Sequence, residues 1–302
     1  MVGSKRRIFK IILKLIKIVL QFINVTSIVA LLTAHFVIKE RTFLSSLIFY
    51  ALPLPIIIVV VLFISIVLTK KWRRFNLILA SILLLVWLSK SFKLHIPDDI
   101  NKSDLEIVFW NASRANDFQM AFNKNEGVPD VMVLVESKKN DIEEFKRKYP
   151  NYCFYKSDRE LFVFSKAPLI IESENKSKFS TTVINFKTFG INFYAVDVTG
   201  SFDVPREWGL NYVNKQINRK DNTIVLGDFN VPYESIYLKQ FKKGFNHAFN
   251  EKGNGFRETW YNNIPLLSLD HIWVSKDLKV LKTEKFYTKE SDHSMLKTYI
   301  RK

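Results

Sequence analysis

The sequence has 302 residues, and its 45 Lys+Arg and 29 Asp+Glu give a formal net charge of +16. Residues 1–97 hold 14 of the basic residues and one acidic residue, Glu40, whereas residues 98–302 hold 31 basic and 28 acidic residues, a net charge of +3. Nucleic-acid-binding domains are more often strongly basic in their soluble part, so the total charge is no argument for DNA or RNA binding. The single cysteine, Cys153, excludes an intramolecular disulfide and with it a disulfide-stapled secreted domain.

Long apolar stretches dominate the N-terminal third. Residues 18–38 and 42–69 contain no Lys, Arg, Asp or Glu, and each is long enough to cross about 30 Å of hydrocarbon. A third run, Phe75–Ser89, is shorter, but the basic and Trp residues that flank it suit membrane interfaces. A cleaved signal peptide does not fit three such runs separated by short charged loops. The prediction is a membrane region over residues 1–97, with three transmembrane helices at about 16–38, 43–69 and 73–91.

Basic residues predict the orientation of these helices. Six of them precede the first span and four lie between the second and third, whereas the first loop has only Lys39 and Arg41. The positive-inside rule therefore places the N-terminus and the second loop in the cytoplasm, and three spans place the chain after about Lys93 outside it. If the third run lies on the membrane surface, the C-terminal domain is cytoplasmic instead. We expect a multi-pass protein of the cell membrane whose partner is the lipid bilayer, with no obligate protein partner evident.

A short polar linker around Lys93–Asp104 leads into the second region, residues 98–302. Its apolar runs and their periodicity predict, in chain order, a strand at 105–110, a helix at 115–125, a strand at 129–136, a helix at 141–148, strands at 152–155, 161–165, 181–186 and 191–198, a helix at 205–218, a central strand from 223, a helix at 234–243, and strands at 266–274 and 295–300. Strands alternate with helices early and follow one another later. This pattern favours one α/β domain with a packed pair of sheets.

The central strand, Thr223–Leu226, is followed by Gly-Asp-Phe-Asn. An Ile-Val-Leu run without alternation predicts a strand buried on both faces. Gly227 would allow a sharp exit that puts Asp228 and Asn230 at the carboxyl end of the strand, where α/β proteins usually place their chemistry. On its own the motif is also an ordinary turn, because Asp and Asn beside Gly form turns readily.

Polar residues recur where apolar strands end. They are carboxylates, carboxamides and imidazoles, namely Asn111, Glu136, Asp228, Asn230, Asp270, His271, Asp292 and His293. Ligands dominated by oxygen suit Mg²⁺ or Mn²⁺ better than zinc. A divalent cation, an imidazole and amide donors together are suited to the attack of water on a phosphorus ester.

These residues, in this order, resemble the endonuclease/exonuclease/phosphatase superfamily, which has the deoxyribonuclease I-like fold. The resemblance covers almost all of residues 105–302. It is carried by the strand that ends in Asn111, by Val133–Glu136, Phe164–Ser165, Gly227–Asn230, Gly253–Trp260 and Leu269–Ser275, and by Ser291–His293. Several N-terminal spans also look like the membrane-attached bacterial members of the family. The resemblance implies an α/β (α+β) catalytic domain at 98–302, a four-layer α/β/β/α sandwich, preceded by a bundle of about three transmembrane helices.

The resemblance also implies roles for individual residues. Glu136 would bind the metal, Mg²⁺ or Mn²⁺, with help from Asn111, and Asp292 would add a ligand. Asp228 and Asn230 would orient the attacking water and a phosphoryl oxygen.

His293 would be the general acid/base or the hydrogen-bond donor to phosphate, with Asp270 holding its tautomer. His271 would contact phosphate, and the alternative is an interior histidine bonded to backbone. Family members usually carry a second catalytic His where this sequence has Asp197. An ionised Asp cannot donate to phosphate, so that contribution is lost, rerouted through metal, or taken by Arg206. Loss of one such donor typically costs about 10² to 10³ in rate.

The sequence therefore predicts a membrane-anchored, Mg²⁺-dependent phosphodiesterase, a hydrolase that acts on nucleic acid or phospholipid outside the cytoplasm. The near-neutral charge of residues 98–302 weakens the nucleic-acid version, because phosphate neutralisation supplies most non-specific affinity. One alternative is a lipid head-group phosphodiesterase of the sphingomyelinase or phosphoinositide phosphatase kind. Another is a catalytically weakened module that binds a phosphate ligand, motivated by Asp197.

Overall fold

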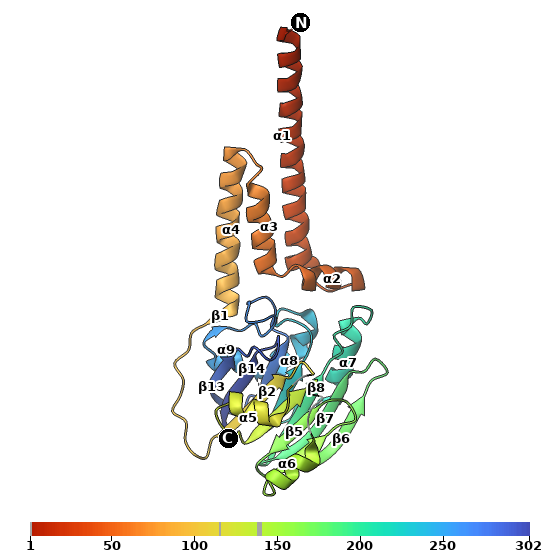
Figure 1. Ribbon diagram of the computed structural model, residues 1–302, viewed down its shortest axis with the longest axis vertical. Helices are drawn as coiled ribbons and strands as arrows, with labels where there is room; N and C mark the ends of the chain where they lie inside the picture. Colours follow the sequence, from red (N-terminus) through yellow and green to blue (C-terminus); the bar gives the residue numbers. More distant parts are fainter. Residues whose placement is uncertain (1, 115, 138–140) are drawn as a thin grey trace. The chain divides into compact units, whose positions relative to one another are not determined.

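The computed structural model describes residues 2–114, 116–137 and 141–302, the side chains of residues 2–6 excepted. By its internal contacts the chain divides into two compact units, Met1–Lys90 and Ser91–Lys302 (Figure 1).

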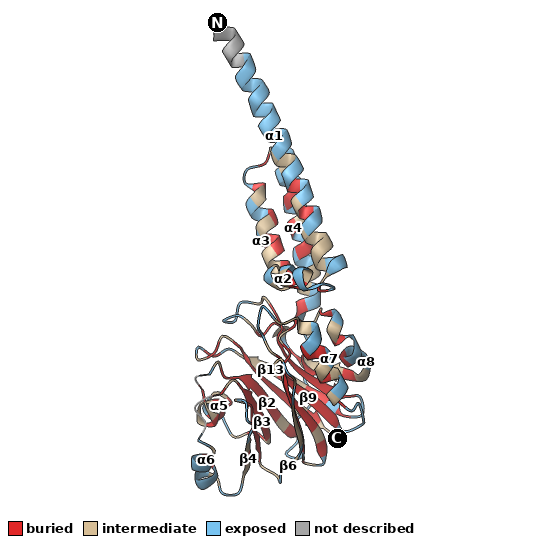
Figure 2. Cartoon of the chain, turned by 90° about the vertical axis from the view of Figure 1, so that its right-hand side faces the viewer, coloured by how far each residue is buried: buried red, intermediate tan, exposed pale blue. Residues whose placement is uncertain are grey.

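The N-terminal unit is helical. It comprises α1 (Val2–Thr33), the π-helical turn η1 (Ala34–Ile38), α2 (Phe43–Ala51), α3 (Leu54–Ser65) and most of α4 (Lys70–Ser91). Buried apolar side chains of α1, α3 and α4 pack together around Ile57 and Val61. Asn24 of α1 and Asn76 of α4 exchange two side-chain hydrogen bonds of 3.3 and 2.8 Å in this core. Most outward-facing residues of α1 are apolar and exposed (Figure 2), as expected of a helix that meets lipid.

Two of these helices are long and apolar enough to cross a membrane, at Arg7–Ile38 and Lys70–Ser91, and a third crossing requires α2 and α3 to count as one span. The prediction of one continuous helix over 43–69 is wrong, because α2 and α3 meet at 71°. Pro53 is the cause. A proline disfavours the helical conformation of the residue before it, and Leu52 has φ −122° and ψ 62°. Pro53 then caps the start of α3.

The C-terminal unit is built on two six-stranded sheets (Figure 1). The first has the order β13-β14-β2-β3-β5-β4 and the second β10-β12-β9-β8-β7-β6. The strands of the first sheet are β2 (Leu105–Asn111), β3 (Val131–Val135), β4 (Cys153–Lys156), β5 (Phe162–Ser165), β13 (Lys279–Phe286) and β14 (Met295–Arg301). Those of the second are β6 (Ile170–Lys176), β7 (Thr182–Thr188), β8 (Ile191–Asp197), β9 (Thr223–Asp228), β10 (Phe245–His247) and β12 (Asp270–Ser275). The short strands β1 (Phe92–Lys93) and β11 (Gly255–Phe256) pair with each other.

The two sheets pack face to face, and helices cover their outer faces. Apolar side chains from both sheets form the central core. On the first sheet, α5 (Phe118–Lys124) and α6 (Ile142–Lys148) bury phenylalanines against the outer face. The second sheet is covered by α7 (Arg206–Gln216) and α8 (Lys239–Gly244), and the short helices η2 (Ile236–Leu238) and α9 (Ala248–Lys252) complete the unit. The predicted four-layer α/β/β/α sandwich is confirmed.

The predicted strands correspond to observed strands, and the differences have local causes. The helix expected at 115–125 begins at Phe118, capped by the side chain of Asp117, and Ala115 lies outside the described residues. The helix expected at 234–243 is divided into η2 and α8. In the two large sheets the sequence pattern missed β6, β10 and β13, which all lie at sheet edges. Charged residues interrupt the apolar alternation of β6 and β13, and β10 has only three residues.

Phe118 anchors α5 to the first sheet. It is fully buried, and its ring lies 5.6 Å from that of Phe145 and 5.4 Å from that of Phe154 between centroids. Replacing it with Leu leaves space that its neighbours cannot fill, so we expect Phe118→Leu to lower the free energy of unfolding by about 1–2 kcal/mol. Urea denaturation of the full chain in detergent measures this. Phe202→Leu at a site that is 82% exposed is the control, and an equal loss in both variants would contradict the packing argument.

Candidate active site

The strand ends predicted to carry chemistry lie at one edge of the sandwich. β8 and β9 are parallel, and Asp197 is in register with Asp228. β12 runs antiparallel to β9, with Asp270 in register with Asp228. Three aspartates therefore lie in a row across adjacent strands of the second sheet. Asp228 is central and almost completely buried.

The first sheet reaches the same edge. Asn111, the last residue of β2, donates from Nδ2 to Oδ2 of Asp228 at 3.0 Å, a hydrogen bond between the two sheets. The indole of Trp110 donates to the carbonyl of His293 at 3.2 Å. Side chains from both sheets border a cleft of about 870 Å³, lined by Arg114, Glu136, Asp158, Arg159, Glu160, Ser180, Asp197, Thr199, Gly200, Ser201, Asp228, Asn230 and His293. Residues far apart in the sequence thus share one cleft.

His293 and Asp270 form a buried pair in this cleft. Nδ1 of His293 lies 2.8 Å from Oδ2 of Asp270. Burial by itself lowers the pKa of His293, but the charge and hydrogen bond of Asp270 and the charge of Asp228 outweigh it and raise the pKa to about 10. The structure therefore favours an imidazolium at neutral pH. Because Nδ1 faces Asp270, Nε2 is the nitrogen left to serve the cleft.

Asp228 and Asn230 are held by the backbone around them. The N–H of Asn230 donates to Oδ1 of Asp228 at 2.8 Å, and Nδ2 of Asn230 donates to the carbonyl of Val198 at 2.7 Å. Asn230 has φ 51°, in the left-handed region that Asn tolerates better than most residues. Burial and the neighbouring charge of Asp270 raise the pKa of Asp228 well above its usual value.

Gly227 has a different function from the one expected. The strand does not end there, because β9 continues through Asp228. A Cβ at Gly227 would lie 1.9 Å from the carbonyl oxygen of Val196 in β8. Glycine is therefore required by the close approach of the neighbouring strand rather than by a turn.

Glu136 follows β3 directly and lines the cleft with a half-exposed carboxylate. Its φ of 51° is costly for a residue with a side chain, and such conformations concentrate at functional sites. Nε of Arg114 lies 3.3 Å from Oε2 of Glu136, and the N–H of Arg114 donates to the Glu136 carbonyl. The segments that follow β2 and β3 therefore place a cation and an anion side by side at the cleft.

Asp292 supports the site through two hydrogen bonds. Oγ of Ser113 donates to Oδ1 at 2.6 Å, and the indole of Trp260 donates to Oδ2 at 2.8 Å. Burial works against ionisation, but these hydrogen bonds and the charge of His293 lower the pKa of Asp292. These bonds fix the orientation of the carboxylate, and each of its oxygens keeps a further lone pair, so the metal ligation expected of Asp292 stays a prediction.

Two groups of residues have the chemistry to hold a divalent cation. One is Glu136 with the amide oxygen of Asn111, hard oxygen donors of the kind that Mg²⁺ prefers. The other is Asp228, Asp270 and His293, whose ligand atoms lie within 4.8 Å of one another. In the second group Nδ1 of His293 is already hydrogen-bonded to Oδ2 of Asp270. Among the described residues Oδ1 of Asp270 is buried without a hydrogen-bond partner.

His271 and Arg206 do not face the cleft as expected. His271 is fully buried, its Nδ1 lies 3.0 Å from Nε2 of His247, and its Nε2 lies 3.0 Å from the carbonyl of Val231. Burial lowers its pKa to about 4, so it is neutral. This is the interior histidine of the alternative interpretation, and no ring nitrogen remains for phosphate.

The guanidinium of Arg206 is hydrogen-bonded to backbone carbonyls. It donates to the carbonyls of Asn230, Thr199, Ser201 and Gly200 at 2.6–3.1 Å. Arg206 therefore shapes the loop at the cleft rim, and the predicted substrate contact is not supported. Two other guanidinium groups, those of Arg114 and Arg159, line the cleft, and the sequence pattern identified neither. For Arg114 the available signal was its position three residues after Asn111, in the same loop.

Asp197 occupies the place where the family resemblance expected histidine. Burial, followed by the charges of Glu136 and Glu160, raises its pKa to about 7. Near neutral pH the carboxyl is therefore partly protonated, and a protonated carboxyl donates a hydrogen bond.

This pKa predicts how the stability of the protein depends on pH. Between pH 3.8 and about 7 the folded state binds this proton more tightly than the unfolded chain does, so the contribution of Asp197 to stability falls as pH rises through that range. Asp197→Asn removes the titration. We expect its melting temperature to exceed that of the wild type at pH 8, by a margin that shrinks towards pH 4. Scanning calorimetry at both pH values checks this, and a margin independent of pH would refute it.

Comparisons with known proteins agree with this architecture. Residues 109–293, more than half of the chain, match the sequence model of the Endonuclease/Exonuclease/phosphatase family. Similar solved structures include an endonuclease/exonuclease/phosphatase family protein from Bacteroides thetaiotaomicron (16% identity, 67% of this chain and 98% of that one, TM-score 0.50) and truncated TDP2 from Caenorhabditis elegans (17%, 68% and 100%, TM-score 0.50). A functionally unknown conserved protein from Enterococcus faecalis is also similar (15%, 65% and 99%, TM-score 0.50). No curated protein matches the sequence significantly.

Proposed function

The chain belongs to the endonuclease/exonuclease/phosphatase family, whose members hydrolyse phosphoric esters, and from this premise we propose that it is a membrane-anchored, Mg²⁺- or Mn²⁺-dependent phosphodiesterase. The observation that carries the proposal is the cleft in which Glu136, Asp228 and His293 meet. An imidazolium, an amide and carboxylates at one rim are the groups that phosphoryl transfer to water requires.

The surroundings of each cleft residue indicate its role in the reaction. Nε2 of His293 donates to a phosphoryl oxygen or protonates the leaving oxygen, because Asp270 keeps the ring charged and fixes its orientation. Asp228, held by Asn111 and by the N–H of Asn230, orients the attacking water and accepts its proton. Asn230 lines the cleft beside it and is positioned by Val198.

The remaining cleft residues bind the ester. Glu136 and Asn111 would hold the divalent cation, which when bound supplies positive charge against the phosphoryl oxygens. Arg114 adds a guanidinium that suits a phosphate, and Asp197, when protonated, adds a donor. This arrangement replaces the expected contributions of His271 and Arg206.

The N-terminal unit supports a membrane anchor. α1 and α4 are apolar over membrane-spanning lengths. Lys17 of α1 and Lys70 of α4 line one cavity, so the two helices begin their apolar stretches at the same end of the bundle. If both cross the bilayer, the chain between them returns through α3, and the positive-inside rule then favours a catalytic domain outside the cytoplasm. A reporter fused after Lys302 tests this. Activity of a reporter that works only in the cytoplasm would overturn it.

A direct assay tests the catalytic proposal. The purified full chain in detergent is incubated with Mg²⁺, Mn²⁺ or EDTA and with plasmid DNA, sphingomyelin, phosphoinositides or bis(p-nitrophenyl) phosphate. We expect hydrolysis that requires the metal. If only the lipids are hydrolysed, the protein is a lipid head-group phosphodiesterase and not a nuclease.

Asp197 motivates a second candidate, a module that binds a phosphate ligand without turning it over. It predicts that a non-hydrolysable phosphate ligand stabilises the protein while all four substrates stay intact. Absence of metal-dependent turnover together with such binding would favour this candidate.

A further inference from the structure

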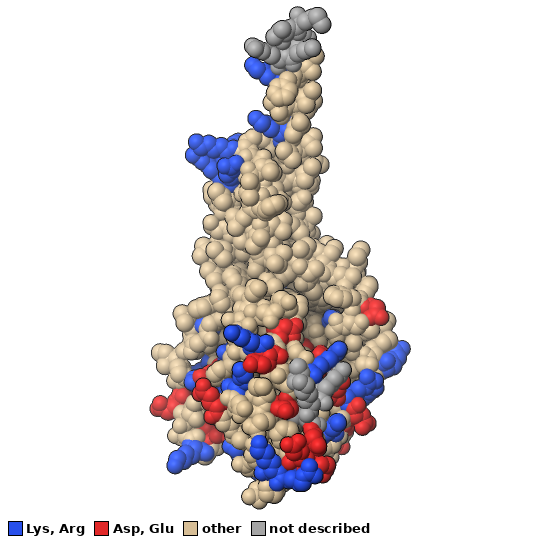
Figure 3. Space-filling model, in the orientation of Figure 1, with Lys and Arg blue, Asp and Glu red and all other residues tan. Residues whose placement is uncertain are grey.

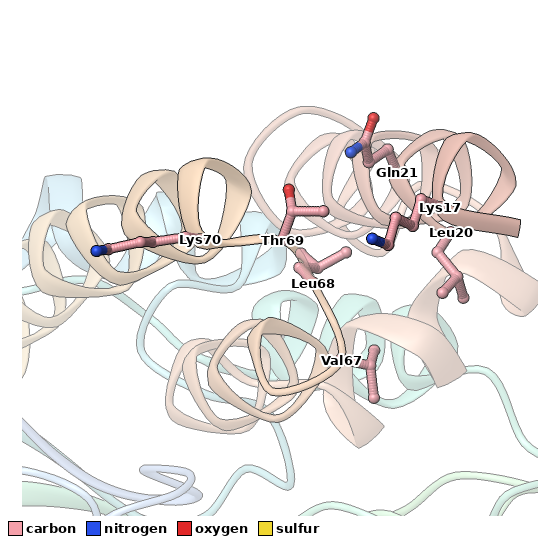
Figure 4. Close-up of a pocket in the computed structure, with 7 residues that line it drawn as sticks. All are labelled: Lys17, Leu20, Gln21, Val67, Leu68, Thr69 and Lys70. Carbon is pink, nitrogen blue, oxygen red and sulfur yellow. The ribbon is translucent and has the colours of Figure 1, made fainter. Parts of the chain in front are cut away.

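A second cavity, of about 350 Å³, lies within the N-terminal unit (Figure 4). Lys17, Leu20 and Gln21 of α1 border it on one side, and Val67, Thr69 and Lys70 border it on the other, where the chain passes from α3 to α4. None of these residues takes part in the catalytic cleft. The cavity combines apolar walls with an amide, a hydroxyl and two ammonium groups.

The cavity lies at the boundary of the apolar stretches. Lys17 is the last charged residue before the run 18–38, and Lys70 is the first charged residue after the run 42–69. These two boundaries are distant in the sequence but border the same cavity. In a bilayer, the point where apolar helices give way to lysines is the level of the lipid head groups.

The charges at this end of the bundle are all of one sign among the described residues. Lys10, Lys14 and Lys17 lie on α1, and Lys70 and Lys71 begin α4 (Figure 3). The single acidic residue of the region, Glu40, follows η1, and it is separated from Lys17 by about 34 Å of helix at 1.5 Å per residue. The positive charge of these lysines would attract an anion from outside the protein.

The cavity offers hydrogen-bond donors for such an anion. Figure 4 shows the side chain of Lys17 projecting from α1 towards Thr69. The side chain of Lys70 points away from the centre of the cavity. The first N–H groups of the 22-residue helix α4 have no partner within the helix, and the helix dipole favours negative charge at this point. Leu20 and Val67 supply apolar surface beside these donors.

We propose that this cavity binds the phosphate head group of an anionic phospholipid, with Lys17, Thr69 and Gln21 holding the phosphate and Leu20 and Val67 contacting the start of an acyl chain. Basic pockets between membrane helices on the cytoplasmic side are suited to such head groups. The inference rests on the proposed membrane anchor and is independent of the catalytic proposal. The site fixes the bundle against the leaflet that carries anionic lipid.

Native mass spectrometry of the full chain tests the proposal. The protein is released from detergent after incubation with dioleoylphosphatidylglycerol or dioleoylphosphatidylcholine. The variant Lys17→Gln is compared with Lys14→Gln, which removes the same charge from the same helix outside the cavity. A lysine beside an anionic lipid contributes about fivefold to binding, so we expect affinity for phosphatidylglycerol to fall about fivefold in the first variant and to stay near that of the wild type in the second.

Retention of phosphatidylglycerol by the wild type and by the control variant, but not by the cavity variant, supports the site. Equal losses in both variants, or equal retention of phosphatidylcholine, overturn it. If glycerol 3-phosphate stabilises the protein as much as phosphatidylglycerol does, the cavity binds a free phosphate. That result would overturn the lipid proposal. Unchanged circular dichroism and hydrolytic activity of the cavity variant confirm that it is folded. If alkaline carbonate releases the wild-type protein from membranes, the proposed membrane anchor is wrong. This outcome is distinct from a loss of lipid binding at the cavity.

Discussion

Replacing His293 with Gln is expected to lower the rate of metal-dependent phosphodiester hydrolysis about 10²- to 10⁴-fold, the range typical of a general acid or base. The physical reason is the loss of the charged Nε2–H, which Asp270 maintains through the 2.8 Å bond to Nδ1. Initial rates with bis(p-nitrophenyl) phosphate at saturating Mn²⁺ measure the effect. The glutamine side chain is polar and of similar size, which limits structural damage.

A matched control uses a histidine of the same unit outside the cleft. His95 is half-buried and contacts the carbonyl of Gly253. His95→Gln should retain the wild-type rate. A similar loss in both variants would show that His293 contributes only to folding.

The pH dependence of the rate follows from the same pair. The pKa of His293 is raised from 6.5 to about 10, so the ring keeps its charge across the neutral range and loses it as pH rises through about 10. The stability that the charged pair contributes is complete below pH 6.5 and is lost over the same rise. We expect the rate to fall towards pH 10, and Asp270→Asn to move this fall to lower pH. A rate that rises towards pH 10 would instead identify His293 as a base that works uncharged.

Glu136→Gln is expected to lower the rate about 10²- to 10³-fold and to raise the Mn²⁺ concentration needed for half-maximal activity at least about tenfold. A neutral amide is a weaker ligand than a carboxylate for a hard divalent cation. The half-exposed carboxylate of Glu136 at the cleft is the group that the cation would meet. Titration of activity with Mn²⁺ after removal of metal by EDTA separates the two effects.

Glu160 provides the control, because it lines the same cleft and carries the same charge. Glu160→Gln removes one negative charge from the same cleft without altering the proposed metal ligand. The Mn²⁺ requirement should stay near that of the wild type. Equal changes in both variants would mean that the cleft attracts the cation only through its total charge.

The apolar N-terminal helices, most strands of the sandwich and the order of the polar residues that end them can be predicted from the sequence. These features follow from local chemistry, because continuous apolar runs and their periodicity depend on neighbours along the chain. The positions of Asp228, Asp270 and His293 were predictable for the same reason. Asp228 and Asp270 lie at the ends of observed strands, and His293 precedes one by two residues.

The contacts of these side chains depend on how distant segments pack. The bond between Asn111 and Asp228 joins the two sheets, and the close approach of Val196 explains Gly227. The positions of the strands in the sequence do not show that His271 points into the core. Nor do they show that the guanidinium of Arg206 donates its hydrogen bonds to backbone carbonyls. Both outcomes depend on which atoms other segments bring nearby. Hydrogen-bond saturation and burial are properties of packing between distant segments, and the sequence pattern records neither.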